Sequence, residues 1–429
     1  MSKTMLKPLF FVAIMALCFT ACTDGDDIID EPTTSLFVIE NFTVNGTTET
    51  FTLLEGAFDA DYTLDNTTNW LISGGVFVKN GVTLTVEAGT TVYAADDASI
   101  PFIAVRQGGK IDAQGTVNSP IVFTTVRSLT DVAEAGDWGG LILNGYANLN
   151  IPEPAEGEGD TGAYGGDDDN DNSGTMRYVR VEYAGKKLAT DNELNGFSFN
   201  GVGSGTTLEY LQAYKCADDG FEFFGGTVSL KYAVAMGAGD DSFDWTFGWS
   251  GNGQFWLADQ RGPEGDRGIE GDSNGDDNLA TPYSMPTLSN ITLIGMAEPE
   301  DTDGEANTGM RLREGTKGFI YNTIIADFPN NGVRVSDEAT TVNMTNGDLV
   351  VANSVVANVG TAWADCASFE SDATNATLLN SDALLNGGYI GTVENNATDP
   401  TALGAWFDDA SYIGAVQNGN DWLEGWTAQ

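Results

Sequence analysis

The chain has 429 residues, of which 63 are acidic and 18 are basic, so its formal net charge is −45 at pH 7. Nucleic acids and anionic lipid surfaces bind positively charged proteins, and this charge excludes them as partners. The absence of histidine excludes Ser-His-Asp and Cys-His catalysis and histidine-bound metals. A hard cation such as Ca²⁺, which prefers oxygen ligands, remains compatible with so acidic a chain.

Residues 1–21 have the features of a signal peptide. Lys3 and Lys7 precede an apolar run from Leu9 to Ala21, which is too short to remain in a bilayer as a spanning helix. The run ends in a small residue before Cys22 and resembles a bacterial lipobox, in which that cysteine is lipidated and becomes the mature N-terminus. The alternative is an ordinary signal peptide followed by a chance cysteine. We predict an acidic tether and an N-terminal cap over residues 22–69.

A short motif of glycine, apolar, variable and apolar residues recurs from residue 196 onward. Its copies are GFSF at 196, GFEF at 220, SFDW at 242, GIEG at 268, GMRL at 309 and GVRV at 332. A second strand-like run, such as LEYLQAY or LKYAVAM, follows each copy. Two alternating strands and their turns in about 22–25 residues make one coil of a parallel β-helix. We predict an all-β fold, a single-stranded right-handed parallel β-helix over residues 70–392, with an aromatic C-terminal cap over residues 393–429.

Alternation within the motif assigns the faces of each strand. Phe221 and Phe223 should point into the interior and Glu222 outward. The outward residues of the six copies should form a column, in the order Ser198, Glu222, Asp244, Glu270, Arg311 and Arg334. Carboxylates about 4.8 Å apart repel one another, so the column requires a cation, a shared proton or nearby arginines. A solvated ladder and a ligand surface that runs from acidic to basic are both open interpretations.

Paired aspartates precede two of the motif copies. Asp218-Asp219 and Asp240-Asp241 are typical of turns, where the side chains accept hydrogen bonds from nearby backbone amides. The same residues resemble the NTDG and GDD motifs of polygalacturonase-type glycosidases. That resemblance implies base-side carboxylates at Asp219 and Asp240 and an acid at Asp241, with Arg311 and Arg313 in place of the RIK motif. The chain has GIEG where that family has a histidine-containing motif.

Two loops rich in aspartate and asparagine are candidate calcium sites. They place oxygen ligands at alternate positions: Asp167, Asp169 and Asp171 in the first, and Asp272, Asn274 and Asp276 in the second. Calcium takes six to eight such ligands. Both loops lack the glycine and glutamate of an EF-hand, and the alternative is a solvated acidic loop.

Three aromatic residues and two cysteines complete the candidate features. Trp245, Trp249 and Trp256 lie near the column and offer platforms for sugar rings, although core packing is favoured for Trp245. Cys216 and Cys366 are too few for a zinc site. We predict two buried thiols rather than a disulfide, because Cys216 ends an apolar run.

Four segments resemble a group of bacterial surface lipoproteins and secreted proteins that have a right-handed parallel β-helix. These are WGGLILNG at 138, GAYGGDDDNDNSG at 162, DDGFEFFGGTV at 218 and DWLEGWT at 421. The resemblance implies a lipid-anchored protein of the outer membrane that faces the exterior. We predict a module that binds a glycan or an outer-membrane partner such as a nutrient transporter. The alternatives are a polysaccharide-degrading enzyme, either a hydrolase or a calcium-assisted lyase, and a structural adhesin.

Overall fold

The computed structural model describes residues 38–44, 47–189, 192–261, 265–295, 307–382, 384–385 and 388–429. All of them belong to one unit, Thr33–Gln429. Cys22 and the predicted signal peptide lie outside the described residues. Within the described part, no helix has both the length and the apolar character needed to cross a membrane.

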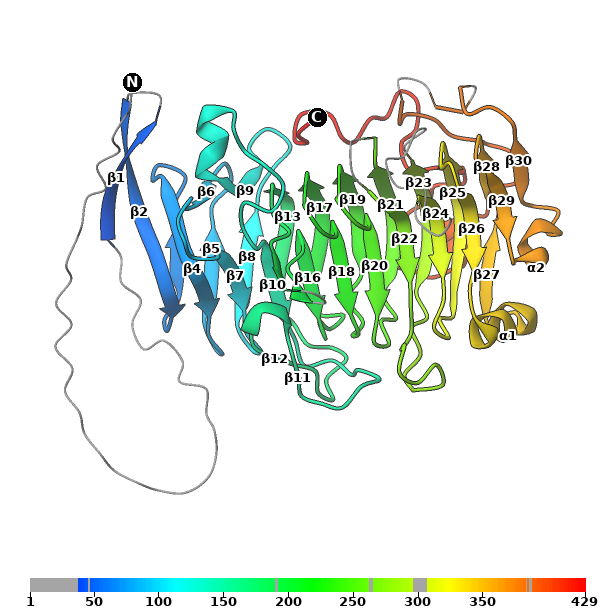
Figure 1. Cartoon of the computed structure of the whole chain (residues 1–429), viewed down its shortest axis with the longest axis horizontal. Helices are drawn as coiled ribbons and strands as arrows, with labels where there is room; N and C mark the ends of the chain where they lie inside the picture. Colours follow the sequence, from blue (N-terminus) through cyan, green and yellow to red (C-terminus); the bar gives the residue numbers. More distant parts are fainter. Residues whose placement is uncertain are drawn as a thin grey trace, which may run out of the picture. The chain divides into compact units, whose positions relative to one another are not determined.

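Successive coils stack side by side and form three faces of parallel strands, as the repeat predicts (Figure 1). Face 1 consists of β7 (Phe102–Val105), β10 (Leu141–Asn144), β16 (Phe197–Asn200), β18 (Phe221–Phe224), β20 (Phe243–Thr246), β22 (Arg267–Gly271), β24 (Thr308–Leu312), β26 (Asn331–Val335) and β29 (Thr361–Ala364). The chain is thus the right-handed parallel β-helix predicted from its sequence.

Faces 2 and 3 are built largely from long strands that bend in the middle. These are β13 (Gly174–Glu182), β17 (Thr207–Tyr214), β19 (Leu230–Met236), β21 (Asn252–Asp259), β23 (Thr287–Ile294) and β25 (Gly318–Ala326). Their first halves continue face 2 from β3 (Tyr62–Leu64), β5 (Thr83–Val86) and β8 (Lys110–Gln114) to β27 (Leu349–Ala352). Their second halves continue face 3 from β6 (Thr91–Ala94) and β9 (Ile121–Thr125) to β28 (Val355–Ala357) and β30 (Ala376–Leu378).

The coil stack begins earlier than residue 70, the start that the sequence predicts. β2 (Thr47–Phe58) already pairs in parallel with β4 (Trp70–Val78), and both strands bend between faces 3 and 1. β1 (Val38–Val44) lies antiparallel to β2 and covers that first edge. Short helices interrupt the turns: η1 (Val126–Thr130), η2 (Glu158–Asp160), α1 (Glu338–Asn346), α2 (Ala367–Glu370) and η3 (Pro400–Ala402).

The glycine that opens the repeated motif is required by the close approach of neighbouring coils. A Cβ atom on Gly196 would lie 2.6 Å from the carbonyl oxygen of Gly220, and one on Gly309 would lie 2.6 Å from that of Gly332. Contacts this short are not tolerated by a side chain. The motif therefore keeps a glycine so that the coil can stack.

The interior is a column of stacked aromatic and aliphatic side chains, and the predicted face assignment is confirmed. Phe221 and Phe223 are fully buried, whereas Glu222 between them is partly exposed. The Phe221 ring stacks on Phe197 at 5.0 Å and on Phe243 at 5.2 Å between ring centroids. Aromatic pairs at such distances add stability beyond the area that they bury.

Both remaining cysteines are free and buried, which confirms the prediction of two thiols. Cys216 and Cys366 are each 1% exposed. Burial raises the pKa of each thiol to about 12, so both stay protonated and unreactive at neutral pH.

The sequence predicts that the aromatic C-terminal residues cap the open end of the β-helix, and this prediction is wrong. Residues 396–429, here called the C-terminal strap, lie along the side of the coils instead (Figure 1). Asn322 donates to the Thr398 carbonyl at 2.9 Å, and Arg180, several coils away, donates to the Trp426 carbonyl at 2.8 Å. Trp426 is fully buried against face 3, because that side exposes apolar residues that the strap can cover.

Candidate functional site

The outward residues of face 1 form the column that the repeat predicts. The strand register places one residue of each coil beside the next, in the order Ser198, Glu222, Asp244, Glu270, Arg311 and Arg334. Ser198 and Glu270 are buried, at 4% and 6% exposure, so the column is not a freely solvated ladder.

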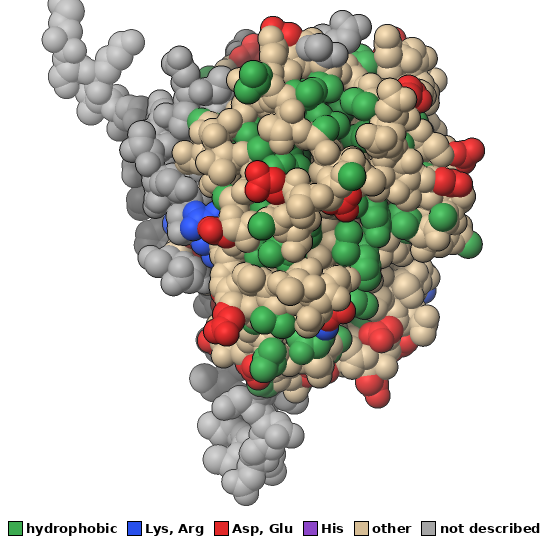
Figure 2. Space-filling view, turned by 90° about the vertical axis from the view of Figure 1, so that its right-hand side faces the viewer, with side chains coloured by type: hydrophobic (Ala, Val, Ile, Leu, Met, Phe, Trp, Pro, Cys, Tyr) green, Lys and Arg blue, Asp and Glu red, His purple; other side chains and the backbone are tan. Residues whose placement is uncertain are grey.

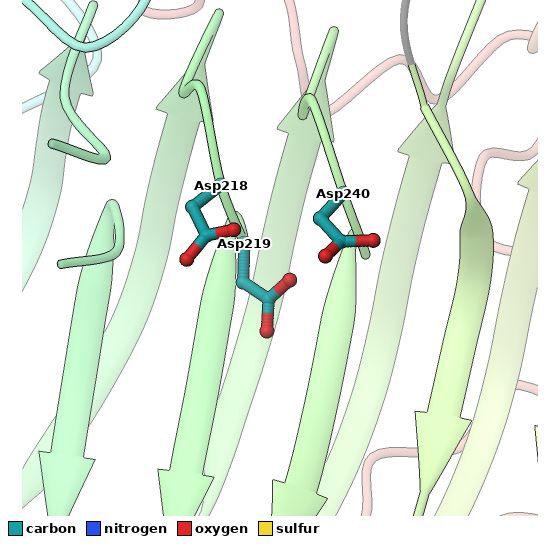
Figure 3. Close-up of side chains that lie close together, drawn as sticks. All are labelled: Asp218, Asp219 and Asp240. Atoms are coloured by element: carbon teal, nitrogen blue, oxygen red, sulfur yellow. The ribbon is translucent and has the colours of Figure 1, made fainter. Parts of the chain in front are cut away.

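Paired aspartates stand at the turns that lead into β18 and β20. Figure 3 shows Asp218, Asp219 and Asp240 close together, and an oxygen of each carboxylate lies within 4.8 Å of the others. Asp219 also has the turn role that its position suggests. Its Oδ1 accepts the backbone N–H of Asp241 at 2.9 Å, and its own N–H donates to Asn195 Oδ1 at 3.2 Å.

The turn aspartates and the acidic part of the column form one continuous group, which we call the acidic cluster. Its members are Asp218, Asp219, Glu222, Asp240, Asp241, Asp244, Asp266 and Glu270. Within the described residues, carboxylate oxygens lie within 4.8 Å of one another in four overlapping groups of three. Every group shares a member with another group, so the carboxylates form an unbroken chain across three coils.

Burial and mutual repulsion hold the cluster partly protonated. Desolvation, followed by the charge of Asp240, raises the pKa of Asp218 to about 8. Asp240 lies at the exposed rim of the cluster, and its pKa is raised to about 6 by desolvation and then by Asp266. Desolvation is also the first cause, and neighbouring carboxylates the second, of pKa values raised well above normal at Asp219, Glu222, Asp241 and Asp244.

Three buried oxygens within the cluster have no hydrogen-bond partner in the described part of the chain. These are Asp241 Oδ1, Asp244 Oδ1 and Glu270 Oε1, and the last lies 3.1 Å from Arg267 Nε in an ion pair. Asp241 is only 3% exposed, and its second oxygen lies 3.4 Å from an Arg267 nitrogen. A buried carboxylate oxygen without a partner is costly, and a proton or a cation removes that cost. The oxygen-only donor set fits Ca²⁺.

At the end of the cluster formed by Glu270, arginine side chains make ion pairs with this carboxylate. Arg313 Nη2 lies 2.7 Å from Glu270 Oε2, and Arg267 Nε lies 3.1 Å from Glu270 Oε1. Arg311, the partner that the sequence predicted, lies farther away at 3.9 Å. Sequence reasoning missed Arg267, although its place three residues before Glu270 at the start of β22 was a usable signal.

A long insertion between β10 and β13 contributes residues that the sequence analysis also missed. It contains β11 (Ala155–Glu156) and β12 (Ala163–Tyr164). Desolvation raises the pKa of Glu158 to about 7, and it raises the pKa of the buried Tyr164, with Glu222 as the second cause. Asn195 Nδ2 donates to Glu222 Oε2. None of these residues stands in the repeated motif, so its periodicity gave no signal for them.

The first predicted calcium loop is organised by its own turns. Asp169 Oδ1 accepts the backbone N–H of Asn148 at 3.1 Å, and Asp171 Oδ2 accepts the hydroxyl of Ser173 at 3.2 Å. Asp167 is exposed. These three residues do not form one of the close carboxylate groups found among the described residues.

The second predicted calcium loop has other contacts. Asp272 accepts a hydrogen bond from Arg313 Nε at 2.9 Å. Asn274 Oδ1 accepts the backbone N–H of Asp276 at 3.0 Å, and Asn274 Nδ2 donates to the Asn150 carbonyl at 3.0 Å. Calcium binding by either loop stays a prediction, because the carboxylates that come together are those of the acidic cluster.

The predicted aromatic platforms for sugar rings are absent from the surface. Trp245, Trp249 and Trp256 are all fully buried. Trp249 stacks on Phe223 at 4.3 Å between ring centroids, inside the β-helix. The expectation for Trp249 and Trp256 was therefore wrong, because the interior column buries them.

The acid and base roles implied by the polygalacturonase resemblance stay a prediction, although the closest oxygens of Asp240 and Asp241 lie nearer to each other than an inverting pair requires. An oxygen of Asp240 lies within 4.8 Å of one from Asp219 and of one from Asp241. Inverting enzymes keep acid and base about 6.5–9.5 Å apart, which leaves room for the attacking water. Arg313 is engaged by Glu270 and Asp272, and Arg311 lies beside Glu270. The spacing suits a shared cation or proton better than an intervening water.

Comparison with known proteins identifies the family to which the chain belongs. Searches of curated proteins and of solved structures found no match. The model of a family described as a pectate-lyase-like β-helix domain matches residues 56–427, which include both the coils and most of the C-terminal strap. The chain therefore belongs to the pectate-lyase-like β-helix domain family.

Proposed function

We propose that the protein binds an acidic polysaccharide at face 1 through a divalent cation held by the acidic cluster. The observation that carries this proposal is the pair of buried oxygens without hydrogen-bond partners, Asp241 Oδ1 and Asp244 Oδ1, inside a chain of close carboxylates. Family membership supports a polysaccharide as the ligand class.

The acidic cluster has the features that a bridging cation requires. Asp241 and Asp244 supply buried oxygens, and Asp240 stands at the exposed rim. A bound Ca²⁺ would neutralise their mutual repulsion and offer its remaining coordination positions to carboxylates of the ligand. Without a cation, the cluster would repel a polyuronide. We therefore expect binding to depend strictly on the metal.

Binding to polygalacturonate in the presence and absence of Ca²⁺ tests the proposal. We expect Ca²⁺ to raise the melting temperature and to permit binding measured by isothermal titration calorimetry, and a chelator to abolish both effects. Asp241→Asn should raise the dissociation constants for Ca²⁺ and for polygalacturonate by about tenfold or more, since one charged ligand of the cation is lost. Asp59→Asn, a substitution of an exposed acid in the first coil, is the matched control. Binding that is unchanged in chelator, or unchanged in Asp241→Asn, would contradict the proposal.

A lyase is the second candidate function. Asp241 beside Arg267 and Asp272 beside Arg313 have raised pKa values, and either carboxylate could accept a proton from a uronide ring while arginine stabilises the resulting charge. Incubation with polygalacturonate, followed by ultraviolet detection of an unsaturated product, separates the two functions. Product that disappears in Asp241→Asn would replace the binding function with the lyase.

Attachment to the cell surface is the remaining part of the proposal. Cys22 follows a signal-like segment, and the chain after it is acidic. Lipidation there would hold the β-helix at the outer membrane, where polysaccharides or a transporter partner are accessible. Cys22→Ala should shift the protein from the membrane to the soluble fraction or block its processing. Correctly cleaved Cys22→Ala protein that stays in the membrane fraction would exclude this anchor.

A further inference from the structure

The last coil leaves two strand edges without a strand partner in the described part of the chain. β29 pairs only with β26, and β30 pairs only with β28. The end of face 2 is covered, because Asn375 Nδ2 donates to the Val351 carbonyl at 2.8 Å and to the Phe369 carbonyl at 2.9 Å. An unpaired edge offers a row of backbone donors and acceptors to another strand.

A groove of about 690 Å³ lies beside β29, between α1 and α2. Met344 and Trp363 contribute apolar surface to its lining. Asp337, Asp365 and Glu370 add three carboxylates, all from exposed residues. Neither lysine nor arginine lines the groove. It therefore combines an apolar base with a negative rim.

Other apolar residues of the last coil and of α1 are also exposed. Val342 on α1 is 49% exposed, Leu378 at the end of β30 is 39% exposed, and Leu379 is 96% exposed. Figure 2 faces this end of the β-helix and shows apolar side chains gathered across it, with acidic side chains around them and few basic ones. Contiguous apolar surface next to an open strand edge is typical of a protein-interaction site.

The negative charge of this end favours a partner with basic residues. A second copy would bring an equally acidic rim and a formal charge of −45 against the first, which opposes end-to-end pairing. The C-terminal strap is used elsewhere, since the Gln429 carbonyl accepts a hydrogen bond from Tyr214 on face 3. We propose that the C-terminal end of the β-helix binds an extended segment of a partner protein, in which basic and apolar side chains alternate, as an added strand on β29.

Each part of the segment has a counterpart in the structure. Its backbone would continue face 1 beyond β29, as peptides do when they add to a sheet edge. Alternate side chains of a strand point to opposite sides, so its apolar residues would contact Met344 and Trp363 while its basic residues reach Asp365 and Glu370. The partner would thereby extend the solenoid, at a site separate from the acidic cluster.

A synthetic peptide of alternating lysine and valine is the probe that tests this inference. We expect it to bind the full chain in isothermal titration calorimetry, and an alternating glutamate and valine peptide not to bind. The double substitution Asp365→Lys and Glu370→Lys should weaken binding by about a hundredfold, roughly tenfold for each reversed charge. The control is Glu55→Lys with Asp59→Lys, two exposed acids near the other end that give the same change in net charge. Equal loss in both double variants would show general charge attraction and overturn the proposal.

Two further measurements separate strand addition from other modes of binding. A lysine and valine peptide that is N-methylated at alternate residues cannot donate hydrogen bonds along one edge, so it should bind at least about tenfold more weakly than the parent. Equal binding of the methylated peptide would refute an added strand. Analytical ultracentrifugation should show a monomer. A dimer that the double substitution Asp365→Lys and Glu370→Lys disrupts would assign this end to a second copy and overturn the proposal.

Discussion

Two ladders, each a row of similar residues from successive coils, run along the β-helix at the same coil spacing. They differ in whether their side chains find hydrogen-bond partners. At the bend between faces 2 and 3, Tyr178, Tyr210 and Tyr232 stack at 4.3 and 4.2 Å between ring centroids. The bend then continues with Phe255 and with three asparagines, Asn290, Asn322 and Asn353, all with positive φ. On face 1, the corresponding ladder consists of carboxylates.

The asparagines of the first ladder are hydrogen-bonded to the C-terminal strap. Asn290 Nδ2 donates to the carbonyls of Ala410 and Tyr412 in the C-terminal strap, at 2.9 and 2.6 Å. Asparagine tolerates the left-handed backbone conformation at this bend. Neutral amides can repeat at coil spacing without repulsion, and the strap supplies their acceptors. This ladder is therefore structural.

The acidic cluster keeps like charges close together with buried oxygens that lack hydrogen-bond partners among the described residues. A fold that needed only stability could replace these carboxylates with amides. This difference supports our proposal that the acidic cluster holds a ligand. Four predictions test this contrast, in order of decreasing effect.

The largest effect should come from the interior that both ladders share. Phe221→Ala removes a fully buried ring that stacks on Phe197 and Phe243, and it should lower the free energy of unfolding by about 3–5 kcal/mol. Urea denaturation measures this loss. Glu222→Gln, one residue away on the same strand, is the matched control and should not destabilise. A larger loss in Glu222→Gln than in Phe221→Ala would reverse our assignment of the faces.

The paired ladder should be the next most sensitive. Asn322→Ala removes bonds to Ser289 and Thr398 from a fully buried site with φ of 56°. We expect a loss of about 2–4 kcal/mol in the free energy of unfolding, measured by urea denaturation. Asn322→Gly keeps the backbone conformation accessible and isolates the hydrogen bonds, so it should lose less. No loss in either variant would show that the strap does not stabilise the coils.

A substitution in the acidic cluster should have the opposite sign. Asp244→Asn mimics the protonated side chain, whose pKa is raised by desolvation and then by Glu270. At pH 8 in chelator, it should raise the free energy of unfolding by about 1 kcal/mol, because a buried charge is removed. In saturating Ca²⁺, the gain should shrink or reverse, since a ligand is lost. Destabilisation in chelator would make Asp244 a structural residue and remove the contrast between the ladders.

The smallest effect should be a shift of stability with pH. The folded-state pKa values of Asp218 and Asp272 are raised to about 8, above the usual value near 4 in an unfolded chain. Protonation of these groups therefore favours the folded state, and that stability is lost as pH rises toward 8. We expect the melting temperature in chelator to fall between pH 5.5 and about 8.5, and Ca²⁺ to suppress the fall. A melting temperature that rises over this range would contradict the raised pKa values.

Much of the architecture could be predicted because the repeat is local. Glycine, two inward apolar residues and one outward residue recur at similar intervals except across one long insertion, and stacking then places Glu222, Asp244 and Glu270 beside one another. The order of the column follows from sequence spacing alone. Its acidic and basic ends follow in the same way.

What the sequence could not determine lies in contacts between distant segments. The strap was expected at the open end, but its aromatic residues are buried on the side of the coils, where Trp426 meets Tyr210 more than two hundred residues earlier in the chain. Two residues outside the periodic positions of the motif act on the acidic cluster: Arg267 pairs with Glu270, and the charge of Glu158 acts on Glu222.

The sequence by itself determined the coil, its interior face and the order of the charged column, because hydrophobic alternation and glycine spacing act within one or two coils. Only the tertiary structure decided that Asp219, Asp241 and Glu270 are buried and that Asp241 and Asp244 keep oxygens without hydrogen-bond partners in the described chain. It also decided that β29 and β30 each pair with only one strand among the described residues. Burial depends on where insertions and the strap fold. Their positions are set by the whole surface available to them rather than by any local pattern.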